Sequence, residues 1–197
     1  ADNLEMGETY ELIIPSTLGG KNVTSIGKNA FSSCRSFSSV IIPDTVTNLS
    51  DSAFIHCHEM EVVHLPANLV TIGDSAFWDC AFTNLSIPAT VESIGGKAFS
   101  AIDELTNITV AAGNTHYCTV NNVLFRMEDG VKTELVQFPI GGTSEEYAIP
   151  SGIKKICGGA FMSSRYLESV TIPEGVTYIG DNAFRECSRI ETISIPS

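Results

Sequence analysis

One short segment gathers the residue types that bind metals. Its candidates are His56, Cys57, His58, Glu59, Glu61 and His64. Imidazole nitrogen, thiolate sulfur and carboxylate oxygen are the donors that proteins offer to zinc, usually as a tetrahedral set. No second cluster in the sequence completes such a set, and Cys57 occupies a position that a repeating pattern turns inward. The sequence therefore favours solvated loop residues, and we predict neither a metal site nor a cofactor.

The six cysteines are the next candidates for chemistry. Four of them fall four residues after the alanine of a recurring Ala-Phe pair: Cys34, Cys57, Cys80 and Cys187. Because cysteine behaves as a small hydrophobe, buried free thiols are the interpretation that we favour. Two alternatives stay open. One is a disulfide between neighbours of this series, for which parallel Cβ vectors give poor geometry, and the other is a link between Cys118 and Cys157.

The sequence lacks the common catalytic motifs. It contains no Gly-x-Ser-x-Gly elbow, no phosphate-binding loop and no dinucleotide fingerprint. The carboxylate pairs Glu128-Asp129 and Glu145-Glu146 lie in apparent loops, whereas a glycosidase holds two carboxyl groups at a set separation in a cleft. We therefore predict that the protein is not an enzyme.

An internal repeat of about 23 residues positions these side chains. Its Ala-Phe pair begins at residues 30, 53, 76, 98, 160 and 183, and a proline recurs at residues 15, 43, 66, 88, 150, 173 and 196. The step from Pro66 to Pro88 is 22 residues, with the missing residue after Phe77. Before the prolines, inward and outward residues alternate, as in Leu85-Ser86-Ile87, which is typical of a half-buried strand.

A single unit of this length cannot bury both of its apolar sides, so the units must stack. We predict one continuous core in which equivalent residues lie one strand spacing apart, about 4.8 Å. The phenylalanines of the Ala-Phe pairs should form a ladder that is interrupted where the repeat is interrupted. Each proline should end a strand because it has no N–H to donate. One set of glycines should open a turn that a Cβ would hinder: Gly27, Gly73, Gly95 and Gly180.

Two segments interrupt the repeat. Five extra residues around Leu18-Gly-Gly-Lys-Asn predict a surface loop. Over about 111–148 the Ala-Phe signal disappears, and Asp129-Gly130 lies between two strand-like runs, which is a strong hairpin signal. We therefore expect one solenoid over residues 1–197, with repeats over about 10–110 and 149–197 and an irregular inserted β-hairpin between them.

The charge of the chain excludes two classes of partner. Its 11 Lys and Arg are outnumbered by 23 Asp and Glu, which gives a formal net charge of −12. Nucleic-acid binding needs a basic patch, and an anionic membrane surface would repel this chain. No apolar run approaches the roughly 18 to 20 residues of a membrane span.

One full unit, Pro173 to Pro196, resembles the BspA-like leucine-rich repeat. It carries Ile-Gly-x-x-Ala-Phe-x-x-Cys in its middle and Ile-x-Ile-Pro at its end, and the segments 121–126 and 138–139 look like a variant unit of that family. The resemblance implies a β-rich solenoid, a right-handed leucine-rich-repeat coil with parallel strands. It also implies a secreted or cell-surface protein of bacteria or mucosal protozoa, with any signal or anchor absent from this chain, and adhesion to host matrix or other cells. The family has no catalytic motif, so no functional residue is transferred.

Outward residues of the predicted strands form the candidate binding surface, because stacked strands present an extended face. The candidates are Ile41, Val62, His64, Asn84 and Asn107 on the strands, with Trp78, Tyr166 and Tyr178 elsewhere in the repeat. The three aromatic residues are proposed as anchors, since Trp and Tyr often carry binding energy. Scattered surface aromatics are the plainer alternative.

These observations predict a non-enzymatic extracellular module that binds a protein or a glycan, with host extracellular matrix as one ligand class. The alternative is a purely structural spacer in a longer surface protein, and an enzyme with the inserted hairpin as a wall of its site comes third. Because no polar cap follows the last predicted strand, we also expect a longer array or end-to-end self-association.

Overall fold

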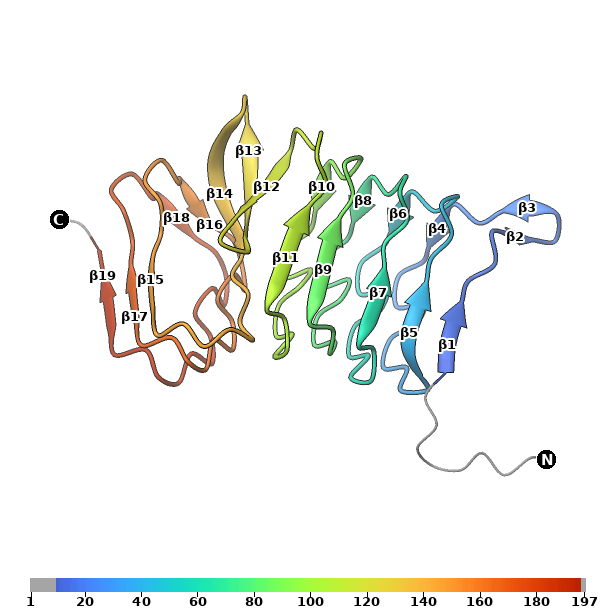
Figure 1. The fold of residues 1–197 in the computed structure, drawn as a ribbon, viewed down its shortest axis with the longest axis horizontal. Helices are drawn as coiled ribbons and strands as arrows, with labels where there is room; N and C mark the ends of the chain where they lie inside the picture. Colours follow the sequence, from blue (N-terminus) through green and yellow to red (C-terminus); the bar gives the residue numbers. More distant parts are fainter. Residues whose placement is uncertain (1–9, 196–197) are drawn as a thin grey trace.

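Each repeat of the sequence forms one coil of a β-solenoid in the computed structural model, which describes residues 10–195 (Figure 1). The predicted strand-ending proline at 196 and the first nine residues lie outside the described part. Within residues 10–195, no helix has the length and apolarity that crossing a membrane requires.

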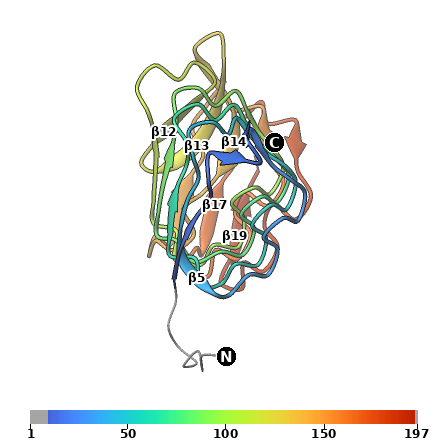
Figure 2. The same ribbon diagram turned by 90° about the vertical axis from the view of Figure 1, so that its right-hand side faces the viewer.

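Two rows of parallel strands run along the solenoid, on different sides of each coil (Figures 1 and 2). The first row contains the strands that precede the prolines: β1 (Tyr10–Ile13), β5 (Phe37–Ile41), β7 (Val62–His64), β9 (Asn84–Ile87), β11 (Asn107–Val110), β15 (Glu146–Ala148), β17 (Ser169–Thr171) and β19 (Thr192–Ser194). The second row contains two-residue strands: β4 (Ser25–Ile26), β6 (Asn48–Leu49), β8 (Thr71–Ile72), β10 (Ser93–Ile94), β16 (Lys155–Ile156) and β18 (Tyr178–Ile179). Equivalent residues pair in register, as in Leu49 with Ile72, which confirms the predicted stacking.

The predicted phenylalanine ladder is confirmed. Ring centroids lie 5.1 Å apart for Phe31 and Phe54, 5.4 Å for Phe54 and Phe77, and 5.9 Å for Phe77 and Phe99. After the interruption a second ladder runs through Phe138, Phe161 and Phe184, with centroids 5.2 and 4.9 Å apart. Phe138 was not part of the Ala-Phe series, and it continues the ladder because its N–H donates to the Ala160 carbonyl 2.9 Å away.

Each repeat glycine begins a hydrogen-bonded turn, as predicted, but the hindrance to a Cβ has another cause than the turn. None of Gly27, Gly73, Gly95 and Gly180 has a positive φ. At Gly73 a Cβ would lie 2.5 Å from the backbone nitrogen of Asp51 in the previous coil, and at Gly95 it would lie 2.4 Å from that of Asp74. At Gly73, Gly95 and Gly180, glycine is therefore required because two coils approach closely, whereas a Cβ on Gly27 would meet nothing within 4 Å.

Both interruptions of the repeat contain antiparallel strands. The predicted surface loop is a small exposed hairpin of β2 (Thr17–Leu18) and β3 (Lys21–Asn22). The predicted turn at Asp129-Gly130 is confirmed between β13 (Val123–Glu128) and β14 (Val131–Gln137). A second turn at Asn121-Asn122, which the sequence did not reveal, joins β13 to β12 (Tyr117–Val120). These strands project beyond the coils at one side (Figure 2).

The inserted strands also connect the two blocks of coils. Side chains of β13 alternate between two apolar cores, since Leu124 packs with the first block while Val123 and Phe125 pack with the second. In addition, β14 pairs in parallel with β16, so it lies in the sheet of the second block. The insertion therefore seals the facing ends of both cores.

Candidate functional site

The outer face of β5, β7, β9 and β11 carries five of the predicted binding residues. Strand pairing places Ile41 beside His64, and Asn84 beside Asn107. Ile41 and Val62 are 36% and 43% exposed, so both present apolar surface to solvent. The Asn107 amide nitrogen donates to the Asn84 side-chain oxygen at 3.2 Å. We call this surface the strand face.

A groove lies in the strand face between β7 and β9. It has a volume of about 350 Å³, and its lining includes Val62, His64, Asn84 and Asn107. β7 and β9 belong to different hydrogen-bonded sheets, and this break coincides with the 22-residue step of the sequence. The irregularity in the repeat thus coincides with a depression in an otherwise continuous surface.

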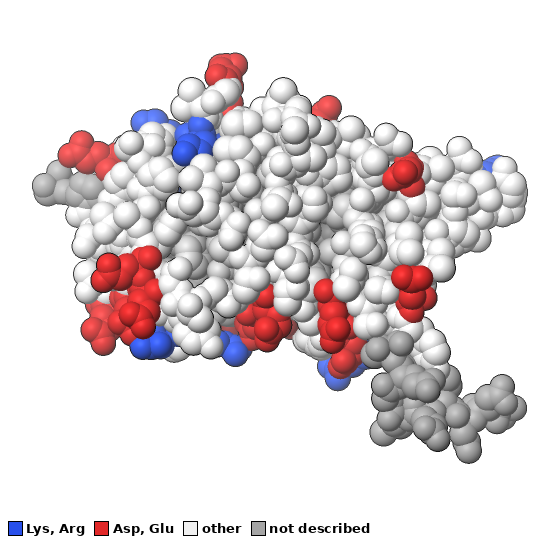
Figure 3. All heavy atoms as spheres, viewed as in Figure 1, with Lys and Arg blue, Asp and Glu red and all other residues white. Residues whose placement is uncertain are grey.

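Charge is almost absent from the strand face. Figure 3 shows its middle as largely uncharged, with Asp and Glu gathered mainly along the edge where the strands begin. In the sequence, Glu61, Glu168 and Glu191 directly precede β7, β17 and β19. A ligand on this face would therefore meet small polar and apolar groups beside an acidic border.

The three predicted aromatic anchors lie apart from the strand face. Trp78 is half-buried in the loop after β8, with its ring centroid 5.6 Å from that of His56. Tyr166 is 45% exposed and lies in the loop between β16 and β17. Tyr178 is 52% exposed on β18, with the Lys155 ammonium 6.0 Å from its ring centroid. The structure does not bring these residues together into one patch.

A larger cleft, which the sequence did not predict, lies where the two blocks of coils meet. It has a volume of about 450 Å³ and is lined by the edge of β10 on one side and by β14, β16 and β18 on the other. Its charged lining residues are Asp74, Lys97, Arg126, Glu134, Lys155 and Asp181. Residues of the inserted strands β13 and β14 form one wall of the cleft, which is the arrangement that the third hypothesis, an enzyme, would need.

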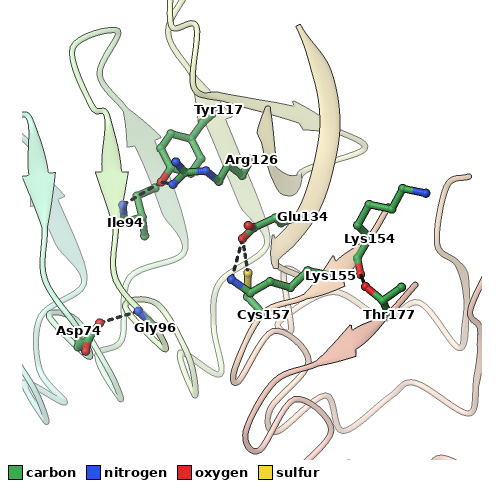
Figure 4. A network of polar contacts seen from close by, with 10 residues as sticks. All are labelled: Asp74, Ile94, Gly96, Tyr117, Arg126, Glu134, Lys154, Lys155, Cys157 and Thr177. Carbon is green, nitrogen blue, oxygen red and sulfur yellow. Dashed lines mark hydrogen bonds and ion pairs between the residues drawn. The ribbon is translucent and has the colours of Figure 1, made fainter. Parts of the chain in front are cut away.

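Several polar groups of the cleft have partners within it (Figure 4). The Tyr117 hydroxyl accepts the Ile94 N–H at 2.8 Å, where a paired strand would otherwise lie. Glu134 accepts hydrogen bonds from the Lys155 ammonium at 3.1 Å and from the Cys157 thiol at 3.3 Å. Burial alone would lower the pKa of Lys155, but the hydrogen bond and charge of Glu134 raise it. The cleft therefore offers a fixed polar lining and holds Lys155 as a cation.

All six cysteines are free thiols, so neither predicted disulfide alternative is formed. Three thiols of the repeated position donate to the carbonyl of the phenylalanine one coil earlier: Cys57 to Phe31 at 3.0 Å, Cys80 to Phe54 at 3.2 Å and Cys187 to Phe161 at 3.0 Å. Cys57 and Cys80 are fully buried, whereas the other four are half-buried. These three thiols therefore donate hydrogen bonds to backbone carbonyls, which apolar Ile102 at the same repeat position cannot do.

Cys157 should be almost inert to alkylation in the folded protein. Burial, reinforced by the negative charge of Glu134, raises its pKa to about 12, and only the thiolate reacts. We expect Cys157 to react with iodoacetamide at pH 8 about a thousandfold more slowly than an ordinary thiol does. Its reaction rate should increase as the pH rises toward 12. Quantifying Cys157 modification by mass spectrometry checks this, with urea-unfolded protein as the fast reference. Glu134→Gln should speed the reaction, and equal rates in folded and unfolded protein would contradict the assignment.

His56, His58 and Asp79 are the residues that could hold a metal, among those that the structure describes. Their donor atoms all lie within 4.8 Å of one another. Asp79 belongs to the coil after the two histidines, 23 residues beyond His56, so no local sequence pattern connects it to them. The Glu59, Glu61 and His64 side chains of the same segment are not part of this group.

Comparison with known proteins agrees with the repeat geometry. A family model described as a BspA type leucine rich repeat region matches in six copies, over residues 24–127 and 142–197. A search of curated proteins finds no match.

Three solved structures share this fold. The pneumococcal vaccine antigen PcpA is 21% identical with a TM-score of 0.72, and the alignment covers 96% of this chain and 61% of PcpA. A leucine-rich repeat protein from Eubacterium ventriosum is 24% identical with a TM-score of 0.74, over 93% of this chain and 59% of that one. A leucine rich cell surface protein from Faecalibacterium prausnitzii is 23% identical with a TM-score of 0.60, over 96% and 70%. The chain therefore spans about three fifths of the length of the first two.

Proposed function

Because the chain belongs to the BspA-type leucine-rich repeat family of bacterial repeat proteins, we propose that it is a non-enzymatic binding module at the cell surface or outside the cell. The strand face is its ligand surface, and a protein is the first ligand class, with host extracellular matrix and glycans as the candidates to screen. One observation carries this proposal. The groove between β7 and β9 lies in a largely uncharged face, has Glu61 at its border, and contains four of the predicted binding residues, Val62, His64, Asn84 and Asn107.

The chemistry of the face supports binding. Val62 and Ile41 supply exposed apolar contacts, and the paired amides of Asn84 and Asn107 supply donors and acceptors in fixed positions. Interfaces generally combine an apolar centre with a polar rim and about one hydrogen bond per 100–200 Å². The acidic border adds selectivity, because it repels ligands of the same charge.

Two observations argue against catalysis. In the cleft, Glu134 is occupied by Lys155 and Cys157. The raised pKa of Cys157 also suppresses the thiolate that a nucleophile would need.

The spacer role remains the second candidate for a specific reason. Trp78, Tyr166 and Tyr178 lie in three separate places, so the strand face lacks a cohesive aromatic patch of the kind that anchors many interfaces. A spacer needs regular stacking and no ligand.

A binding screen distinguishes the two roles. We expect a member of an array of matrix proteins and glycans to bind the chain, and Val62→Asp to weaken that binding at least tenfold, since a charge would enter the apolar part of the groove. Val131→Asp is the matched control, because Val131 is also exposed, at 59%, but lies on β14. Equal loss in both variants would place the ligand elsewhere, and an array without any ligand would support the spacer.

A further inference from the structure

The loops after β6 and β8 place His56 and Asp79 at equivalent positions of neighbouring coils. Both residues follow the alanine of their Ala-Phe pair by three, and both adopt the left-handed conformation, with φ of 61° and 62°. The His56 N–H donates to the Trp78 carbonyl at 2.8 Å. This backbone hydrogen bond fixes the position of one loop relative to the other. His56 and Asp79 therefore face each other because of the geometry of the coils.

The side chains converge on one carboxylate. His56 Nδ1 lies 2.9 Å from Asp79 Oδ2, and His58 Nδ1 lies 3.5 Å from Asp79 Oδ1. Donor atoms about 2.0–2.2 Å from a tetrahedral ion are separated from each other by about 3.4 Å. The two histidine–carboxylate separations are close to that spacing, and the donor atoms of all three residues lie within 4.8 Å of one another. Rotation of the side chains would bring the three donors around one ion.

The surroundings also suit a cation. The three side chains are 38–40% exposed, so an ion and a completing water have access from solvent. The Trp78 ring lies beside His56 and shields one side of the group. The chain as a whole is strongly acidic, with a formal net charge of −12, which raises the local concentration of cations.

The neighbouring cysteines do not compete for this role. Cys57 and Cys80 directly follow His56 and Asp79 in the sequence, but both are buried. Their thiols donate to the Phe31 and Phe54 carbonyls of the interior. The available set is two imidazole nitrogens and one carboxylate, which suits Zn²⁺ and related transition metals more than Ca²⁺ or Mg²⁺.

We propose that His56, His58 and Asp79 form a binding site for a divalent transition-metal ion of the Zn²⁺ type. The ion replaces the histidine–carboxylate contact and joins the loops of two neighbouring coils. Three protein ligands leave one coordination position for water. The inference does not depend on the strand face, because this group lies on the loops that follow the second row of strands.

Titration calorimetry of tag-free, chelator-treated protein with ZnCl₂ tests the proposal. We expect one ion per chain, and a midpoint of thermal unfolding that rises by about 5–10 °C when free Zn²⁺ exceeds its dissociation constant a hundredfold. His58→Ala and Asp79→Asn should each weaken binding by at least about a hundredfold, since loss of even an outer partner of a ligand costs 10–100-fold. The His58 side chain is exposed, so its removal leaves the coil intact.

Two controls make the result specific. Glu186 occupies the position of Asp79 in the last described coil and accepts a hydrogen bond from Ser163. Residues 150–195 contain no histidine, so Glu186→Gln should bind Zn²⁺ as the unchanged protein does. Co²⁺ as a spectroscopic substitute should give ligand-field bands without a thiolate charge-transfer band. Undiminished binding in His58→Ala or Asp79→Asn, or a thiolate band with Co²⁺, would overturn the proposal.

Discussion

Replacing Phe77 by alanine should lower the free energy of unfolding by about 3–5 kcal/mol, the usual cost of removing a fully buried phenylalanine. The Phe77 ring has no exposed surface. It stacks between Phe54 and Phe99 and contacts Phe82 edge-on at 5.9 Å. Each coil of a solenoid depends on its two neighbours, so one lost ring weakens the packing on both sides. Urea unfolding followed by circular dichroism measures the loss.

Phe31→Ala is the matched control for this prediction. Phe31 begins the ladder, is only half-buried, and stacks on a single partner, Phe54. We expect it to cost less than half as much, because a partly exposed ring at the end of the stack buries less apolar surface. If the two substitutions cost the same, ladder position has no energetic meaning, and the stacked core is not what stabilises the coils.

The ladder could be predicted because the repeat places one residue type at one period. The same argument predicted the parallel strands and their prolines. The repeat also places His56 next to Asp79, because the two residues lie 23 positions apart in the sequence, which is one full coil. The local sequence around His56 contains no sign of Asp79, which becomes visible only when residues one repeat period apart are compared.

Other features had no periodic signal. The turn at Asn121-Asn122 was missed because Asn-Asn is a weaker hairpin signal than Asp-Gly, although both residues adopt the positive φ that such a turn needs. The cleft joins Ile94 and Tyr117 of the first block to Glu134 and Lys155 of the second. Its shape depends on how the inserted strands dock between two cores, and that docking depends on packing that no local pattern records.

The glycine after β8 leads to the second large effect. Gly73→Ala should destabilise the protein by more than about 3 kcal/mol, since its Cβ would lie 2.5 Å from the Asp51 nitrogen and 2.6 Å from the Ser50 carbonyl carbon. These are backbone atoms, so the coils themselves must separate. Separation would weaken two contacts, from Gly73 N–H to the Leu49 carbonyl and from Asp74 N–H to Asp51.

Gly27→Ala tests the cause, because both glycines belong to the same Ile-Gly-x-x-Ala motif and neither has a positive φ. A Cβ on Gly27 would meet nothing within 4 Å, so alanine there should be neutral or should stabilise by up to about 1 kcal/mol through the unfolded state. Ser50 fills the equivalent position one coil later, which shows that the motif does not demand glycine everywhere. Thermal and urea unfolding of both variants should therefore give opposite results from identical motifs. If alanine is tolerated equally at the two positions, close contact between coils does not select glycine. If alanine destabilises the protein equally at both positions, the turn rather than the contact between coils requires glycine.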